Sequence, residues 1–214
     1  MKVFRKLILF GLLFILSINL YSQTSLKAKK LLDDVSLKMS NYNNYEFTFK
    51  YMLENSQENI RQESNGKIFV SGSKYRLTTT DVSQLFDGKD LYTIIPENEE
   101  VLITSPDQND DIIVNPTTLI EVYKSGYDFH WDILQNVRGD NIQYIKLIPS
   151  EESLDIKYIL LGINLKTKNR YRLIEIGRQR TTTTLTIENF IVNKKIPIEF
   201  FYFNKADYPE YYIN

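Results

Sequence analysis

The chain has 214 residues, a formal net charge of −1 and no cysteine, and 43% of its residues are hydrophobic. This length is typical of a single domain that buries a core of its own. The lack of cysteine excludes disulfides, cysteine metal ligands and a cysteine nucleophile. The balanced charge argues against nucleic acid as a partner, because nucleic-acid-binding proteins need a concentrated basic surface.

Residues 1–22 have the pattern of a secretory signal peptide. Lys2, Arg5 and Lys6 precede an apolar run from Leu7 to Leu20, and a basic start followed by a short apolar stretch is typical of such peptides. The run is shorter than the ~20 apolar residues of a membrane-spanning helix, although a retained N-terminal anchor is the alternative. Cleavage after residue 22 leaves 23 basic and 27 acidic residues, a net charge of −4.

Residues 25–41 are expected to form an amphipathic helix. Apolar side chains such as Leu31 and Val35 recur mostly three or four residues apart, which places them on one side of a helix. Thr24 or Ser25 is available as the N-cap. The apolar stripe is broad, so we expect this helix to lie across an apolar surface.

The segment 45–53 has the strict alternation of a half-buried strand. One face of this strand carries Tyr45, Phe47, Phe49, Tyr51 and Leu53.

Residues 66–101 follow as an antiparallel meander. The break Asp87-Gly88-Lys89 is a strong hairpin signal, because glycine accepts the positive φ that a tight turn requires. The strands expected here are Ile68–Val70, Tyr75–Leu77, Leu91–Ile95 and Val101–Ile103.

Asn115-Pro116 predicts the start of a second helix, Pro116–Lys124, with Asn as N-cap and Pro at the first helical position. After it the chain returns to strands, and the tail, residues 205–214, is expected to be loosely held. The later strands are expected at Tyr127–Leu134, Ile142–Ile148, Lys157–Leu165, Tyr171–Ile176, Thr182–Val192 and Ile198–Phe203.

The predicted fold class is mainly β. About eleven short antiparallel strands and two modest helices are typical of a barrel, an open barrel or a sandwich. No internal repeat and no linker divide the sequence, so we expect one domain over residues 23–204.

Nothing in the sequence favours an enzyme or a metal site. His130 is the only histidine, which argues strongly against a zinc or iron site. Asp107, Asn109 and Asp111 are spaced like the start of a calcium loop, but Ile112 stands where that loop needs glycine. The glutamate doublets at 99–100 and 151–152 would point to opposite faces of a strand, and no phosphate loop or nucleophile motif occurs. We therefore expect no cofactor and no catalytic residue.

The aromatic content, 15 Tyr and 12 Phe, admits two interpretations. In the first, helix 25–41 packs on the sheet and forms an ordinary core. In the second, a curved sheet encloses more volume than two short helices fill and leaves a cavity for an apolar ligand. Burying an acyl chain is worth ~0.8 kcal/mol per methylene, so such a cavity holds a lipid tail without any catalytic residue.

The order and spacing of these pieces resemble the outer-membrane lipoprotein carrier (LolA-like) family over residues 28–203. The matching pieces are Leu31-Leu32 with Val35-Ser36, Tyr45-x-Phe47-x-Phe49, Gly66-x-Ile68-Phe69-Val70, Lys74-Tyr75-Arg76-Leu77, Asp87-Gly88-Lys89, Tyr92, Pro96-Glu97, Glu99–Val101, Asn115-Pro116 and Phe201-x-Phe203. The resemblance implies an unclosed antiparallel β-barrel whose hydrophobic cavity is covered by short helices.

The resemblance also implies a function and partners. Members of this family ferry lipoproteins through the periplasm, from an inner-membrane ABC transporter to an acceptor at the outer membrane, with the acyl chains of the cargo in the cavity. We expect a monomer with these partners. The alternative is a sensor of the same fold, which detects a lipoprotein or another apolar ligand and reports it to a partner protein.

Candidate site residues follow from the resemblance. The cavity is expected to be lined by Phe47, Phe49, Tyr51, Phe69, Tyr75, Tyr92 and Ile94 from strands, and by Leu119, Ile120 and Tyr123 from the second helix. Enterobacterial carriers have a lid-holding arginine just after the Gly-x-hydrophobic-aromatic-Val strand, where this chain has Ser71-Gly72-Ser73. Lys74 and Arg76 are the candidate replacements.

Overall fold

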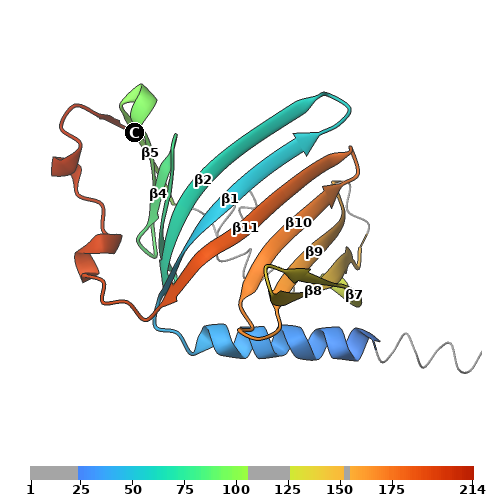
Figure 1. Cartoon of the computed structure of the whole chain (residues 1–214). Coiled ribbons are helices and arrows are strands. Elements are labelled where there is room, and N and C mark those ends of the chain that lie inside the picture. Colours follow the sequence, from blue (N-terminus) through green and yellow to red (C-terminus); the bar gives the residue numbers. More distant parts are fainter. Residues whose placement is uncertain (1–23, 106–125, 152–154) are drawn as a thin grey trace, which may run out of the picture.

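The computed structural model describes residues 24–105, 126–151 and 155–214, and one large sheet dominates it (Figure 1). Its strands are β1 (Tyr45–Asn55), β2 (Ile60–Ser71), β3 (Lys74–Thr79), β4 (Ser83–Phe86), β5 (Leu91–Ile95), β6 (Glu100–Thr104), β7 (Tyr127–Val137), β8 (Asp140–Pro149), β9 (Ile156–Asn164), β10 (Arg170–Gly177), β11 (Thr181–Val192) and β12 (Tyr212–Ile213).

The sheet is antiparallel except at one edge and is not closed into a barrel. Its strand order is β12-β6-β5-β4-β3-β2-β1-β11-β10-β9-β8-β7, and only the short β12 pairs in parallel, with β6. β1 lies in the interior of the sheet, where it pairs with β2 on one side and with the late strand β11 on the other. The expected fold class, an unclosed antiparallel β structure, is confirmed.

The first helix spans residues 24–40, close to the expected 25–41. Its buried side chains are Ala28, Leu31, Leu32 and Val35, which lie on one side of a helix because they are three, four or seven residues apart. They belong to the same core cluster as the β1 aromatics. The expected second helix, Pro116–Lys124, and the acidic loop Asp107–Asp111 lie outside the described residues, as does the expected signal peptide.

The two faces of the sheet are named here by what lies on them. The helix face is the one on which the N-terminal helix packs, and the outer face is the opposite one. Paired residues on neighbouring strands share a face, because side chains alternate along each strand. The helix face carries most of the core, including Phe47, Phe49, Ile68, Val70, Tyr75, Leu91, Ile145, Leu147, Ile159, Leu161, Leu173 and Leu185.

The C-terminal segment, residues 193–214, covers part of the outer face. It runs along the β2–β6 half of the sheet at the left of Figure 1. Phe200 packs on Phe69 with 4.8 Å between ring centroids, and Phe203 stacks on Tyr92 at 4.5 Å. A second, smaller group of buried side chains lies on this side, with Leu85, Ile94 and Val101 on the strands and Phe201 on the segment.

Two expectations about this segment are wrong. Residues 198–201 form a 3₁₀-helix, η2 (Ile198–Phe201), and not a strand; Pro197 stands at its N-cap, and the turn lets Phe200 and Phe201 both reach the sheet. The tail, expected to be loosely held, is bonded to β6. The Tyr212 and Asn214 amides donate to the Glu99 and Val101 carbonyls, and Asn214 accepts from the Ile103 amide at 2.9 Å.

Other differences concern strand extent. The expected strand at 68–70 is only the end of β2, which starts at Ile60 and pairs with β1 from Ile60 to Val70. Residues 60–66 are mostly polar, so their extended structure comes from this pairing and not from a hydrophobic pattern. The turn at Asp87-Gly88-Lys89 is confirmed: Gly88 has φ 102°, and Asp87 accepts hydrogen bonds from the Lys89 and Asp90 amides.

Candidate functional site

The helix face is built around the aromatic row of β1. Tyr45 and Phe47 stack with 6.4 Å between ring centroids, and Phe47 meets Phe49 edge to face at the same distance. These three side chains are at most 9% exposed, while Tyr51, further along the strand, is half-buried. The row exists because every second residue of β1 from Tyr45 to Tyr51 is aromatic, and alternate residues of a strand point to the same face.

Close backbone packing gives the Phe49 ring its place. The ring lies over Gly66 of the neighbouring strand, and a Cβ at position 66 would lie 2.3 Å from Phe49 Cζ. Such a contact is far inside van der Waals separation, so any side chain at 66 would displace the ring. Gly66, the glycine of the Gly-x-hydrophobic-aromatic-Val strand, thus leaves the space that the Phe49 ring of the aromatic row occupies.

Two further aromatic side chains extend the row across the sheet. Phe190 of β11 stacks on both Tyr45 and Phe47, with centroids 5.8 and 6.1 Å away. Tyr75 of β3 is 3% exposed and packs on Phe86 at 5.7 Å. Burial raises the pKa of the Tyr75 hydroxyl to about 12, so the site is apolar enough to disfavour a phenolate.

The N-terminal helix closes one end of this face and is tied down by polar contacts. At its C-terminal end the Lys38 ammonium donates to Asn169 Oδ1 at 3.0 Å and to the Thr167 carbonyl, both in the β9–β10 turn. Near its start, Lys27 Nζ lies 4.1 Å from the Trp131 ring centroid on β7. Lys168 of the β9–β10 turn also lies 4.0 Å from the Asp34 carboxylate of the helix. These polar contacts lie at the rim of the helix, and the apolar contacts of Ala28, Leu31, Leu32 and Val35 lie beneath it.

A polar group interrupts the helix face away from the helix. Glu175 on β10 pairs with Ile159 and Thr183, so it shares this face with Leu173. Burial raises the pKa of the Glu175 carboxyl, and the nearby Asp155 raises it further. The same carboxyl adds to the effect of burial in raising the pKa of Tyr127 on β7.

The structure divides the expected cavity residues between the two faces. Phe47, Phe49, Tyr51 and Tyr75 lie together on the helix face. Phe69, Tyr92 and Ile94 lie on the outer face. The strand pairing explains this. Tyr75 pairs with Val70 and Phe86, and Phe86 pairs with Leu91, so these residues share the helix face. Phe69 and Tyr92, the chain neighbours of Val70 and Leu91, point to the other face, and so does Ile94, two residues beyond Tyr92. Leu119, Ile120 and Tyr123 lie outside the described residues.

The two candidate gating residues also point to the outer face. Lys74 Nζ donates to the Tyr202 hydroxyl at 2.9 Å, and the Arg76 guanidinium lies 4.8 Å from the Phe200 ring centroid. Arg76 pairs with Phe69 across β2 and β3. Both cations therefore hold the C-terminal segment, and their side chains do not reach the face that the helix covers.

Sequence reasoning did not select Phe190 or the helix residues Leu31, Leu32 and Val35 for the site. The helical period already indicated a buried stripe, but no partner could be assigned to it. Phe190 was hidden by an irregularity: the pairing of β1 with β11 shifts register between Glu46 and Thr48, so simple alternation along β11 places Phe190 on the wrong side.

The described residues offer little for catalysis or metal binding. Within residues 24–105, 126–151 and 155–214, no group of three or more His, Cys, Asp and Glu side chains could hold a metal ion. In the same ranges, no helix has both the length and the apolar character to cross a bilayer. What the helix face can do is bury apolar surface.

Comparison with solved structures shows the fold at low sequence identity. An uncharacterised conserved protein from Thermus thermophilus superimposes with a TM-score of 0.53 at 9% identity, over 86% of this chain and 94% of the other. A putative outer membrane lipoprotein-sorting protein domain from Vibrio parahaemolyticus gives 0.46 at 12% identity, with 86% and 98% covered. A LolA superfamily protein from Nitrosomonas europaea gives 0.41 at 12%, with 82% and 97% covered.

Sequence comparison gives the family. No curated protein matches the chain. Residues 18–173, most of the chain, match the family described as outer membrane lipoprotein carrier protein LolA. This range includes the N-terminal helix, the β1 aromatic row and the strands up to the start of β10. The chain therefore belongs to the LolA family of outer membrane lipoprotein carrier proteins.

Proposed function

We propose that this protein carries lipoproteins through the periplasm, from an inner-membrane ABC transporter to an acceptor at the outer membrane. The observation that supports this most directly is the helix face itself. A continuous row of aromatic and aliphatic side chains is covered, in the described residues, by one helix. Such a surface binds acyl chains by burial alone, and membership of the LolA family favours acylated lipoproteins as the cargo.

In this proposal the helix is the cover that moves. Lifting it exposes Leu31, Leu32 and Val35 together with the β1 aromatics, and this costs about 25 cal/mol for each Å² of apolar surface that meets water. An acyl chain that takes the place of the helix recovers ~0.8 kcal/mol per methylene. Helix and acyl chain thus compete for the same apolar surface, which suits a carrier that must both load and release.

The residues proposed to contact the acyl chains are Phe47, Phe49, Tyr51 and Tyr75. The Lys38 contacts with the β9–β10 turn are proposed to hold the helix in its closed position. They take the role that the resemblance gives to the arginine missing at Ser71-Gly72-Ser73. Residues 1–22 are proposed to be the signal peptide that delivers the protein to the periplasm.

The test begins with the protein as it occurs in its own periplasm. Protein purified without detergent is examined by native mass spectrometry, followed by organic extraction. A bound triacylated peptide or intact lipoprotein is the expected result. A protein that is always empty, or that holds only phospholipid, would overturn the carrier proposal in favour of a sensor or general lipid-binding protein.

A cross-link tests the moving helix. Because the chain has no cysteine, the double variant Lys38→Cys, Asn169→Cys accepts a short bismaleimide only at the contact between the helix and the β9–β10 turn. The cross-linked protein is expected to take up no acyl ligand, while the same variant capped with a monofunctional maleimide takes it up normally. Equal uptake by both forms would show that the helix does not open at this end.

A further inference from the structure

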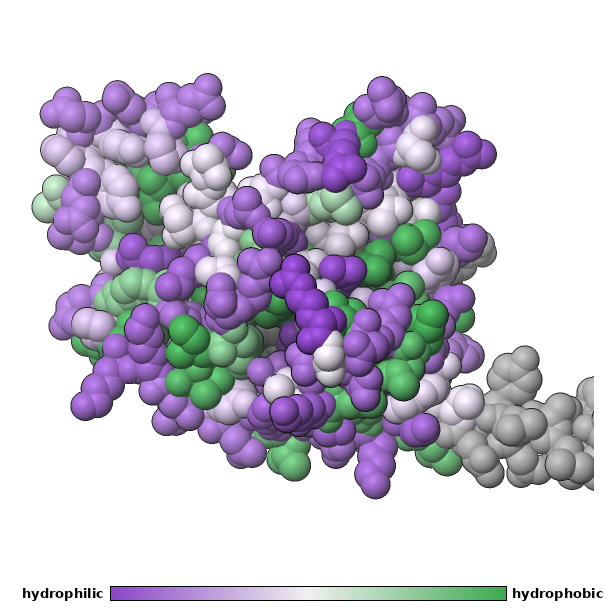
Figure 2. All heavy atoms as spheres, in the orientation of Figure 1, coloured by the Kyte–Doolittle hydropathy of each residue, from purple (hydrophilic) through white to green (hydrophobic). Residues whose placement is uncertain are grey.

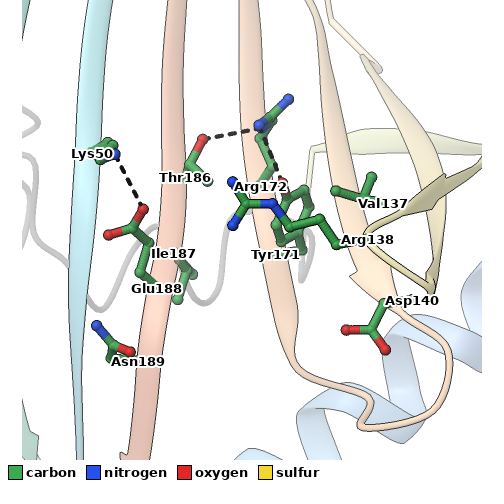
Figure 3. Close-up of a pocket in the computed structure, with 10 residues that line it drawn as sticks. All are labelled: Lys50, Val137, Arg138, Asp140, Tyr171, Arg172, Thr186, Ile187, Glu188 and Asn189. Carbon is green, nitrogen blue, oxygen red and sulfur yellow. Dashed lines mark hydrogen bonds and ion pairs between the residues drawn. The ribbon is translucent and has the colours of Figure 1, made fainter.

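The outer face carries a pocket that the proposed carrier function does not use. Its volume is about 650 Å³, within the range of small-molecule sites. It opens between β1, β11, β10 and the β7–β8 turn (Figure 3). The residues that matter for its chemistry are Lys50, Arg138, Tyr171, Arg172, Thr186 and Glu188.

Lys50, Thr186 and Arg172 of the pocket belong to a row of residues in register across five strands, which continues beyond the pocket to Gly162 and Tyr144. Lys50 pairs with Thr186, Thr186 with Arg172, Arg172 with Gly162, and Gly162 with Tyr144. All five therefore share the outer face. Gly162 makes room for the Tyr144 ring, since a Cβ there would lie 2.9 Å from Tyr144 Cε1. Burial raises the pKa of Tyr144, and the Arg172 guanidinium opposes that rise.

Neutral hydroxyl groups hold Arg172 in place. Its Nε donates to Thr186 Oγ1 at 3.0 Å, and its Nη2 donates to the Tyr171 hydroxyl at 3.3 Å. Figure 3 shows both bonds as dashed lines. Each hydroxyl accepts from the guanidinium and keeps its own proton to donate. The two hydroxyls thus orient Arg172 without neutralising its positive charge, as a carboxylate would. Its N–H groups and the two O–H groups form a cluster of hydrogen-bond donors.

A second guanidinium enters the pocket from another element. Arg138 stands in the β7–β8 turn with φ 52°, beside Gly139 with φ 91°, and in Figure 3 its side chain reaches back across Tyr171. The turn is fixed by Asn136, which accepts from the Gly139 amide at 3.2 Å. In the same view the Asp140 carboxylate points away from both guanidinium groups.

Among the residues that line the pocket, the acidic side chains form no ion pair with these two guanidinium groups. Lys50 and Glu188 form an ion pair of 3.5 Å and so balance each other. Among the residues that the structure describes, no carboxylate oxygen lies within 4.0 Å of the Arg138 or Arg172 guanidinium. An anion between them would relieve their mutual repulsion and accept charge-assisted hydrogen bonds from both.

We infer that this pocket binds a phosphate ester, either a small organic phosphate or the headgroup of a phospholipid. Two guanidinium groups and two hydroxyls approach from different elements, and a tetrahedral phosphate presents oxygens in several directions, whereas a planar carboxylate presents one edge. The volume exceeds that of a bare phosphate, and the Tyr171 ring offers a surface for the organic part. Figure 2 shows that the face of the molecule drawn there carries many hydrophilic residues, with smaller hydrophobic patches between them.

The binding test uses the mature protein and three probes: inorganic phosphate, sn-glycerol 3-phosphate, and monomeric dihexanoyl phosphatidylglycerol. Binding is followed by calorimetry and by the arginine Nε–H signals in NMR spectra. Glycerol phosphate is expected to bind more tightly than inorganic phosphate and to shift the Arg172 signal. Tighter binding of phosphatidylglycerol than of glycerol phosphate identifies the source as a lipid headgroup, and the reverse order identifies a soluble ester.

Variants locate the site. Arg172→Gln and Arg138→Gln are each expected to weaken glycerol phosphate binding by about tenfold or more, because each removes a charge-assisted hydrogen bond donor. Arg61→Gln is the matched control: it removes the same charge from β2, where Arg61 pairs with Glu63 outside the pocket. Thermal melting of each variant shows whether it is folded, and Arg172→Lys, which keeps the charge but loses the fork, gives an intermediate effect.

Three outcomes would overturn the inference: no binding of any probe at 10 mM, tighter binding of inorganic phosphate than of either ester, or equal binding by Arg138→Gln and Arg61→Gln. The carrier proposal is tested separately, because acyl binding on the helix face of these arginine variants is expected to match that of the wild-type protein.

Discussion

The two faces of the same sheet are covered in different ways. The helix face holds one continuous apolar core beneath a helix that precedes the sheet in the chain. The outer face is divided: the C-terminal segment covers the β2–β6 half through aromatic contacts, and the β1, β11 and β10 strands carry a polar pocket. The difference teaches that aromatic content alone does not mark a ligand site, because many of the aromatic contacts here fasten the chain to itself.

The largest expected difference between the two faces comes from truncating one aromatic side chain on each face. Phe49→Ala is expected to lower the free energy of unfolding by about 3–5 kcal/mol, since it empties a buried site, and to reduce acyl binding. Tyr92→Ala, on the outer face, is expected to cost less than half as much and to leave acyl binding intact. Urea unfolding and extraction of bound lipid measure the two effects. Equal loss of lipid from both variants would contradict the division of the faces.

A buried carboxylate fixes the start of the C-terminal segment. Glu46 is 3% exposed and pairs with Lys67 at 3.4 Å and Lys194 at 3.3 Å. Glu46→Gln is expected to lower the free energy of unfolding by about 1–3 kcal/mol, because two charge-assisted contacts are lost. Glu63→Gln, which breaks the exposed pair with Arg61, serves as the control and is expected to stay within about 0.5 kcal/mol of wild type. A reversed order in chemical denaturation would refute this account of Glu46.

The next smaller effect concerns the edge of the sheet. Deletion of residues 212–214 removes the bond between the Ile103 amide and the Asn214 carbonyl. Hydrogen exchange at Ile103 is expected to become on the order of tenfold faster, while the Phe49 amide on β1 keeps its protection. Unchanged exchange at Ile103 would mean that β12 does not protect this edge in solution.

The smallest effect is the pH dependence of stability at Glu175. In the folded state, burial raises the pKa of this carboxyl above its ordinary value of 4.5. Between the ordinary and the raised pKa, the folded chain binds more protons than the unfolded chain. Stability therefore falls as the pH rises through that window. Glu175→Gln removes this penalty. The variant is expected to melt above wild type at pH 7, and the difference is expected to shrink toward pH 4. A constant difference across this range would assign the effect to packing.

Much of the fold could be predicted from the sequence. The alternation of β1, the turn at Asp87-Gly88-Lys89 and the stripe of the first helix are local patterns, and the structure has each of them. The short strand β4 (Ser83–Phe86) was not predicted, because four residues give too little pattern. Residues 198–201, which form the η2 turn, were predicted as a strand because their pattern is ambiguous. An apolar run next to Pro197 fits a strand and a helical turn equally well.

The candidate site could be predicted only in part. Phe47, Phe49 and Tyr51 share a face by their spacing alone. Phe69, Tyr75 and Tyr92 belong to different strands, and their relative faces depend on how β2, β3, β4 and β5 pair. A change of one residue in register moves a side chain to the other face, and the sequence contains no direct measure of register between strands.

By itself, then, the sequence determined the strand and helix periods and the main turns, because these rest on residues close together in the chain. It also determined the family resemblance, because that rests on the order and spacing of such local pieces and needs no knowledge of how they pair. The tertiary structure decided which aromatics meet beneath the helix, that the C-terminal segment occupies the outer face, and that Arg138 and Arg172 share a pocket. Those outcomes depend on contacts between residues up to about 150 positions apart, such as Asn44 with Lys194. Contacts of that kind are fixed only when the whole sheet is paired.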